Sequence, residues 1–266
     1  MKTESTESEF PEGQAFLDLL WNMEAHCSDY SAKALACMGE KAPHCLENIG
    51  TVVSLLYREA CCFYGCAGGD HLIERLAARA CSSTQASLRL LLCGYYDESF
   101  ALTRSLWELG NLLFLFLHDP KSFEQWRQSS KSERNGHFSA VNVRRRLEAL
   151  GLPVPVQQDR YAALCETAVH VTPNVRPQAH NPLGRPMIGP LFQEGGALVA
   201  LNELGGSLCL LGHTFSGLLP MPEARRALLK STSKKLLESL GSLTILNMED
   251  VLRKVRKGKG DNSPIV

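Results

Sequence analysis

Apolar residues recur at helical spacing along most of the chain. In the first such run, Phe16, Leu20, Met23 and Leu35 precede Gly39, which is a suitable helix stop. Later runs of the same kind cover residues 46–64, 71–81, 83–118, 138–150, 157–169, 195–218 and 222–247. Alternation of apolar and polar residues is nowhere long enough to predict a sheet. The pattern therefore predicts a protein built from helices alone.

Turn and capping residues divide these runs. Asp70 can cap the third run, Gly94 is expected to interrupt the run 83–118, and Asp119 with Pro120 suits the start of a short helix. The polar residues 129–136 are predicted to form a loop. Prolines at 173, 177, 182, 186 and 190 favour a stiff loop over residues 170–196. We expect an all-α fold, an antiparallel helical bundle with peripheral helices and one long proline-rich loop.

Composition and charge refine this picture only at the two ends of the chain. Hydrophobic residues make up 44% and charged residues 21%, which is ordinary for a globular protein. The 28 basic and 28 acidic residues balance, but the start of the chain is acidic and its end, RKVRKGKG, is basic. We predict a disordered acidic N-terminus (1–12), a single all-α domain (13–250) and a basic flexible tail (251–266). The tail is either a solvated terminus or a contact for nucleic acid.

Cysteine content and apolar stretches bear on the location of the protein. Ten cysteines would suit a secreted disulfide protein, but no signal-peptide pattern opens the chain. We therefore expect reduced thiols, most of them acting as small buried apolar groups, and a cytoplasmic location. Residues 112–117 are too few to span a bilayer, and residues 197–219 contain Asn202, Glu203 and His213. Both stretches are predicted to be buried helices, and no membrane partner is expected.

A polar stripe runs along an otherwise apolar predicted helix. At about 100° per residue, Asp97, Arg104, Glu108 and Asn111 fall within a band roughly 60° wide. Arginine four residues before glutamate is the weaker order for a surface pair, so we expect Arg104 and Glu108 to form a partly buried pair. That pair either fixes the register of the helix or forms the floor of a pocket for an anionic ligand.

The proline-rich loop supplies further candidates for the same pocket. His170 is expected at a helix C-terminus, where the helix dipole favours the imidazolium form, and Arg176 and His180 follow it. If the loop closes over the stripe, the ligand-binding set is Asp97, Arg104, Glu108, Asn111, His170, Arg176 and His180.

The segment GYYDESFALTRSLWELGNLLFLFLHDPKSFEQW resembles a pattern found in uncharacterised bacterial all-helical proteins. In that pattern an arginine and a glutamate on one helix precede a short helix with tryptophan and a later helix that ends in histidine. The matching positions are Arg104, Glu108, Trp126 and His170, within about residues 84–175. Such proteins are similar to the HEPN superfamily, so the resemblance implies a helical bundle linked to RNA cleavage, toxin–antitoxin pairs or phage defence.

The ribonuclease motif of that superfamily is not present in this chain. It requires an arginine followed by a histidine with four to six residues between them. Here Arg134 and His137 have two residues between them, Arg176 and His180 have three, and Arg160 and His170 have nine. The resemblance therefore supports the fold and a defence or regulatory setting, but not a metal-free nuclease.

Other candidate sites carry weaker signals. Cys61, Cys62, Cys66 and His71 are residue types that bind zinc, but their spacing lacks a paired knuckle, so buried thiols explain them as well. The run VRRR at 143–146 is either a solvated face or a nucleic-acid contact. No glycine-rich phosphate loop is found, and we expect no cofactor.

Two further features lie in the run 195–218. Gly205, Cys209, Gly212 and Ser216 share one helix face, which predicts a close helix–helix contact. His213 is interpreted as a core histidine rather than as a ligand to a metal or substrate.

Two functions are consistent with these features. The first is a non-catalytic helical protein that responds to a ligand or a nucleic acid, in a bacterial defence or stress system. The alternative is a hydrolase, resembling a phosphodiesterase or nuclease, in which Arg104, Glu108 and His170 share a cleft. Whether the protein is an enzyme stays open. The partners we consider are a small anionic ligand, RNA and a second copy of the chain.

Overall fold

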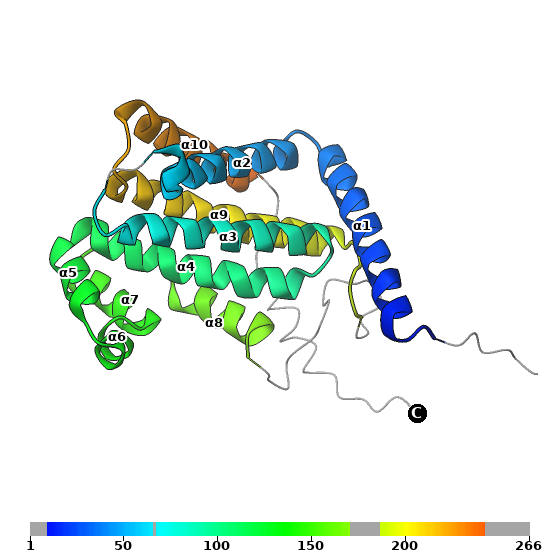
Figure 1. The fold of residues 1–266 in the computed structure, drawn as a ribbon, viewed down its shortest axis with the longest axis horizontal. Coiled ribbons are helices and arrows are strands. Elements are labelled where there is room, and N and C mark those ends of the chain that lie inside the picture. Colours follow the sequence, from blue (N-terminus) through cyan, green and yellow to red (C-terminus); the bar gives the residue numbers. More distant parts are fainter. Residues whose placement is uncertain (1–9, 66–67, 171–186, 243–266) are drawn as a thin grey trace, which may run out of the picture.

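The fold is described from a computed structural model, in which residues 10–65, 68–170 and 187–242 are described (Figure 1). Within these ranges ten α-helices pack against one another and no strand forms, so the predicted all-α class is confirmed. The helices are α1 (Gly13–Cys37), α2 (Lys41–Ala60), α3 (Leu72–Leu92), α4 (Tyr96–His118), α5 (Pro120–Gln128), α6 (Lys131–His137), α7 (Ala140–Ala149), α8 (Gln158–Ala168), α9 (Glu194–Leu218) and α10 (Glu223–Ser242). A 3₁₀ turn, η1 (Cys62–Tyr64), follows α2.

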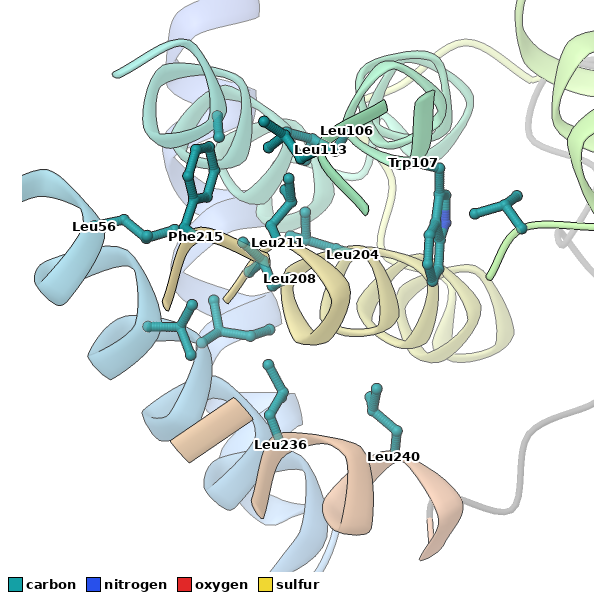
Figure 2. Packing of buried hydrophobic residues seen from close by; sticks show 14 of the residues in the cluster. Leu56, Leu106, Trp107, Leu113, Leu204, Leu208, Leu211, Phe215, Leu236 and Leu240 are labelled. Atoms are coloured by element: carbon teal, nitrogen blue, oxygen red, sulfur yellow. The ribbon is translucent and has the colours of Figure 1, made fainter. Parts of the chain in front are cut away.

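Helix α9 lies at the centre of the bundle. It packs between α4 and α10 and also contacts α2 and α3. Figure 2 shows Leu204, Leu208, Leu211 and Phe215 of α9 surrounded by side chains of these neighbours, and all four are fully buried. A helix that is apolar on every side needs such neighbours to remove it from water.

Both α4 and α9 are long and apolar enough to cross a membrane by length and composition. In their most apolar windows, 56% and 67% of the residues are buried inside the bundle, respectively. The core helices of many globular proteins have the same composition. These two helices are therefore weak evidence for or against a membrane location.

Small residues on α9 allow its neighbours to approach closely. A Cβ atom added at Gly205 would lie 2.8 Å from Leu240 of α10, and one at Gly206 would lie 2.8 Å from Trp107 of α4. The close contact predicted for the face that carries Gly205 is thus formed by α10. The interpretation of His213 as a core residue is wrong, because its side chain is exposed.

Two predicted boundaries are wrong, each for a local reason. Helix α3 continues through residues 83–84 because Thr84 is buried and its hydroxyl donates to the carbonyl of Ala80, 2.8 Å away, instead of capping a new helix. The predicted loop 129–136 contains α6, which is started by a capping box between Ser130 and Glu133. The expected break at Gly94 and the cap at Asp119 are both present.

Several predicted segments lie outside the described residues. They are the first nine residues of the acidic N-terminus, most of the proline-rich loop (171–186) and the basic tail (251–266).

An ion pair with a buried carboxylate attaches α8 to the central helix. Glu203 of α9 is 3% exposed, and its carboxylate accepts from Nε and Nη2 of Arg160 on α8 at 3.0 and 2.8 Å. The indole N–H of Trp107 donates to the same carboxylate at 3.2 Å, and the Arg160 guanidinium lies 4.7 Å from the Trp107 ring centroid. Both oxygens of the buried charge are therefore satisfied.

Substitution Arg160→Met should destabilise the protein, because it leaves the Glu203 carboxylate buried without a cation. We expect the free energy of unfolding to fall by about 3 kcal/mol, measured by urea denaturation. The control is Arg145→Met, at an exposed position on α7, which should change stability by no more than about 0.5 kcal/mol. Equal stability of the two variants would contradict this role for the pair.

The buried cysteines should resist alkylation in the folded protein. Burial raises the pKa of Cys45 to about 12, of Cys81 to about 11 and of Cys209 to about 12, so almost no thiolate exists at pH 8. Cys37 and Cys62 are exposed. Treatment with iodoacetamide at pH 8 should modify the exposed pair first, as read by peptide mass spectrometry. Modification of Cys45 at the same rate in the native protein would contradict the prediction.

Candidate functional site

The predicted Arg104–Glu108 pair forms, and α8 completes a network around it. Arg104 Nη2 donates to Glu108 Oε1 at 3.0 Å, and the two side chains are 18% and 33% exposed. Arg104 Nε donates to Cys165 Sγ at 2.9 Å, while Nη2 also donates to the Tyr161 hydroxyl. Because Tyr161 and Cys165 are four residues apart on α8, both face the same side of that helix. The pair is therefore held from two helices.

Tyr161 is the junction of this network. Its hydroxyl donates to Glu108 Oε1 at 2.5 Å, and its ring centroid lies 4.7 Å from the Arg104 guanidinium carbon and 4.9 Å from that of Arg144. Burial, followed by the hydrogen bond to Glu108, raises the pKa of Tyr161 well above its ordinary value, so the hydroxyl stays protonated and donates. Two cations thus share one aromatic side chain.

The partners of Arg104 stabilise its charged form. Burial acts to lower the pKa of Arg104, but the hydrogen bond to Cys165 and the charge of Glu108 outweigh it, and the net pKa is raised. Cys165 therefore does more than fill apolar space, because its sulfur accepts a hydrogen bond from a cation.

A groove of about 810 Å³ lies beside this network, between α3, α4, α7 and α8. Glu108 and Tyr161 form part of its wall, so the network meets solvent there. Its apolar lining includes Leu76, Leu109, Leu112, Phe138, Val141 and Val143. Its volume falls in the range of pockets that hold small organic molecules.

Three arginines line this groove. Arg75 and Arg79 stand four residues apart on α3, so they share one face of that helix. Both are exposed, and neither makes a hydrogen bond within the described residues. The charge of Arg75 also helps to lower the pKa of the exposed Asp70 carboxyl. The third, Arg144, is buried and donates to Gln158 as well as lying against Tyr161. Exposed cations at the mouth of an apolar groove favour an anionic ligand.

The run VRRR does not form one solvated face. Arg144 is buried in the groove wall, Arg145 is exposed, and Arg146 donates to Gln125 at 3.0 Å with its guanidinium 4.4 Å from the Phe138 ring centroid. The three side chains thus have different environments, and they make no common basic patch.

The other two residues of the predicted stripe, Asn111 and Asp97, lie on either side of the Arg104–Glu108 pair along α4. Asn111 is buried, and its amide bonds both backbone groups of Val156, at 3.2 and 3.5 Å, so it fixes the chain that leads into α8. Asp97 lies two turns before Arg104, about 10 Å away along the helix axis.

The loop residues do not join the network in the part of the chain that the structure describes. His170 is exposed beyond the end of α8. Within the described residues no hydrogen bond joins His170 to the Arg104–Glu108 pair, and the hydrolase hypothesis stays a prediction. Arg176 and His180 lie outside the described residues.

The candidate zinc ligands are only partly described. Cys62 Sγ lies 3.9 Å from His71 Nδ1, and Cys61 is half-buried. Cys66 lies outside the described residues. Within the described ranges no group of three or more potential ligands is arranged to hold a metal ion.

Arg75, Arg79 and Tyr161 were not predicted as site residues, and Arg144 was predicted only as part of the VRRR run. Arg75 and Arg79 have a readable signal, since two arginines four residues apart on a helix that otherwise buries small residues mark one cationic face. For Tyr161 no local signal exists, because its partner Glu108 is 53 residues away in the chain.

Comparisons with protein-family models, with curated proteins and with solved structures found no match.

Substitution Arg104→Met tests whether the pair supports the fold. We expect the free energy of unfolding to fall by about 2 kcal/mol, because Glu108 loses its cation and Cys165 its hydrogen-bond donor. Arg79→Met, which removes an exposed and unpaired arginine from the same groove, is the control and should be neutral within about 0.5 kcal/mol. If Arg104→Met keeps the wild-type melting temperature, the pair has no structural role.

Proposed function

We propose that the protein binds a small anionic ligand in the groove between α3, α4, α7 and α8 and does not transform it. The observation that carries this proposal is that two exposed arginines, Arg75 and Arg79, line a groove whose wall also contains Arg144. A carboxylate, sulfonate or phosphate at this mouth would meet positive charge on two sides.

The charge balance of the groove supports an anion. Among the described residues that line it, Glu108 is the one carboxylate, and it is already paired with Arg104 and bonded by Tyr161. A bound anion would therefore meet three guanidinium groups and a neutralised carboxylate. Arginine suits this role because its planar group can donate two parallel hydrogen bonds to one anionic group.

The apolar part of the lining determines which chemistry suits the uncharged part of the ligand. Leucine, valine and phenylalanine side chains from α3, α4 and the start of α7 cover the groove below the arginines. A ligand with an apolar or aromatic body and one anionic group fits this division. RNA fits less well, because sequence-tolerant binding of single strands uses exposed aromatic side chains. Of the aromatic residues in this lining, Phe138 and Trp107 are buried and Tyr161 is bonded to Glu108.

The arrangement favours binding over catalysis. General acid–base chemistry needs a titratable group that is free to move a proton at the bound molecule. In this groove the Glu108 carboxylate and the Tyr161 hydroxyl bond each other, and His170 is not joined to them. On the HEPN resemblance, the biological setting that we propose for such binding is a bacterial defence or stress response.

Native mass spectrometry of protein purified from its own host tests the proposal. We expect the wild-type protein to carry a small anion that dissociates on collisional activation. In the double variant Arg75→Gln/Arg79→Gln the occupied fraction should fall at least tenfold, because the two cations at the mouth are lost.

Arg145→Gln is the matched control, since Arg145 is an exposed arginine on α7 that does not line the groove. It should keep the wild-type occupancy. Equal occupancy in the double variant, or co-purification of RNA instead of a small molecule, would contradict the proposed function.

A further inference from the structure

A cysteine, a histidine and a glutamate lie together where α2 ends and α3 begins. Cys62 Sγ is 3.9 Å from His71 Nδ1, and the same nitrogen is 3.8 Å from Glu74 Oε1. Cys62 is exposed, whereas the Glu74 side chain is only 12% exposed. A thiol, a base within reach of its proton and a carboxylate beside that base form an arrangement that activates a cysteine for nucleophilic attack.

The local fold sets this arrangement. His71 is the N-cap residue of α3, and its φ of 54° is in the left-handed region, which few residue types other than glycine and asparagine adopt readily. Glu74 follows in the first turn of α3, three residues on, so it lies on the same side of the helix end. Cys62 belongs to η1, the short turn that follows α2. Because Cys62 and His71 are only nine residues apart, local structure alone brings them together.

The two helix ends beside Cys62 act on a thiolate in opposite directions. The first N–H groups of α3, a helix of 21 residues, carry partial positive charge and favour an anion. Cys61 is the C-cap residue of α2, and the last carbonyl groups of that helix disfavour an anion. Since these two effects offset each other, the imidazole of His71 is the group that decides how readily the thiol loses its proton.

Cys62 and His71 line a small pocket. Figure 1 shows the end of α2, the start of α3 and the turn between α9 and α10 at the same end of the bundle, and Pro220 of that turn also lines the pocket. The volume of the pocket is about 230 Å³. Pockets for drug-sized ligands usually enclose about 300–1,000 Å³, so this one suits a small reagent rather than a large substrate.

The remaining charges around this pocket do not oppose a thiolate. Arg225 Nε lies 2.5 Å from Glu59 Oε1, and the Glu59 side chain is 8% exposed, so these two lining residues offset each other. Arg58 also lines the pocket and is exposed in the last turn of α2. Among the described lining residues, Glu59 and Glu74 are the two carboxylates, and each has a basic group beside it.

Cys37 provides an internal comparison. It is also exposed, as the last residue of α1, and its thiol makes no hydrogen bond within the described residues. Cys37 and Cys62 therefore share access to solvent and differ in the histidine that lies beside Cys62.

We propose that Cys62 is a nucleophilic thiol that exchanges with low-molecular-weight disulfides, with His71 as its base. His71 Nδ1 takes the thiol proton, and the Cys62 thiolate attacks one sulfur of the disulfide. A bond forms between Cys62 Sγ and that sulfur, while the disulfide bond breaks and its electron pair leaves on the other half as a thiolate, which the imidazolium protonates. Cys62 is oxidised and the disulfide is reduced, so no further reagent is needed. This inference is independent of the ligand proposed for the groove between α3, α4, α7 and α8.

Treatment of the full-length protein with glutathione disulfide at pH 6.5 tests the proposal. A thiol with an ordinary pKa of about 8.5 is only about 1% thiolate at this pH. We expect the free thiol of Cys62 to be lost at least tenfold faster than that of Cys37. Acid quenching, alkylation of the remaining thiols and peptide mass spectrometry measure both rates in one sample. Equal rates at the two cysteines would overturn the proposal.

Substitution His71→Asn separates the role of a base from a structural role. Asparagine suits the left-handed backbone at this position, so the turn is retained. The Cys62 rate should fall at least fivefold at pH 6.5, but at pH 9.5, where hydroxide supplies the thiolate, it should match the wild type within about twofold. His26→Asn, at an exposed histidine on α1, is the matched control and should leave both rates unchanged.

Two results with the His71→Asn variant would contradict the assigned role of His71. An unchanged Cys62 rate at pH 6.5 would show that the imidazole is not the base. An equal fall at pH 6.5 and pH 9.5 would show that the substitution alters access to the thiol instead of its deprotonation.

Discussion

The buried carboxylate of Glu203 is the constraint on which the arrangement of the site depends. It lies on the central helix α9 at 3% exposure, where a charge is tolerated only if it is fully paired. Arg160 supplies the cation and Trp107 a further donor. Because Arg160 belongs to α8, satisfying this charge fixes α8 against α4 and α9. One residue further along α8, Tyr161 is then placed over the Arg104–Glu108 pair.

Helix α8 thus has one side that faces the core and one side that faces the groove. Arg160 faces the core charge, while Tyr161 and Cys165 face Arg104 and the groove. The network around Tyr161 keeps Arg104 and Arg144 close to one aromatic ring, and only Glu108 offsets their charge. The wall of the groove is therefore positive before Arg75 and Arg79 are counted. The Glu203–Arg160 pair positions α8, and α8 positions Tyr161 in the groove wall. A substitution at Glu203 should therefore alter the groove, although Glu203 does not line it.

Sequence reasoning succeeded where the controlling interactions are local. The pairing of Arg104 with Glu108 could be predicted because the two residues lie one turn apart, and the start of α5 because Asp119 and Pro120 act on their own helix. The capping box of α6 was equally readable from Ser130 and Glu133, although the polar composition favoured a loop. These features need no knowledge of the fold.

Partners of α8 could not be predicted, because they depend on how distant helices pack. Arg160 and Glu203 are 43 residues apart, and Tyr161 and Glu108 are 53 apart. A buried glutamate on an apolar helix signals that a cation must come to it, but any of the 28 basic residues would satisfy that requirement from sequence alone.

The arginines near the groove are of two kinds: some are bonded to partners within the fold, and others are exposed to solvent. Arg104, Arg144 and Arg160 are each bonded to a partner and lie against an aromatic ring, so their positions are set by packing. Arg75 and Arg79 make no hydrogen bond and no ring contact within the described residues, yet they line the groove beside Arg144. Exposed arginines cost a helix little, so stability does not require them at these two positions. We propose that a ligand explains their placement beside an apolar groove, whereas packing explains the positions of the paired arginines.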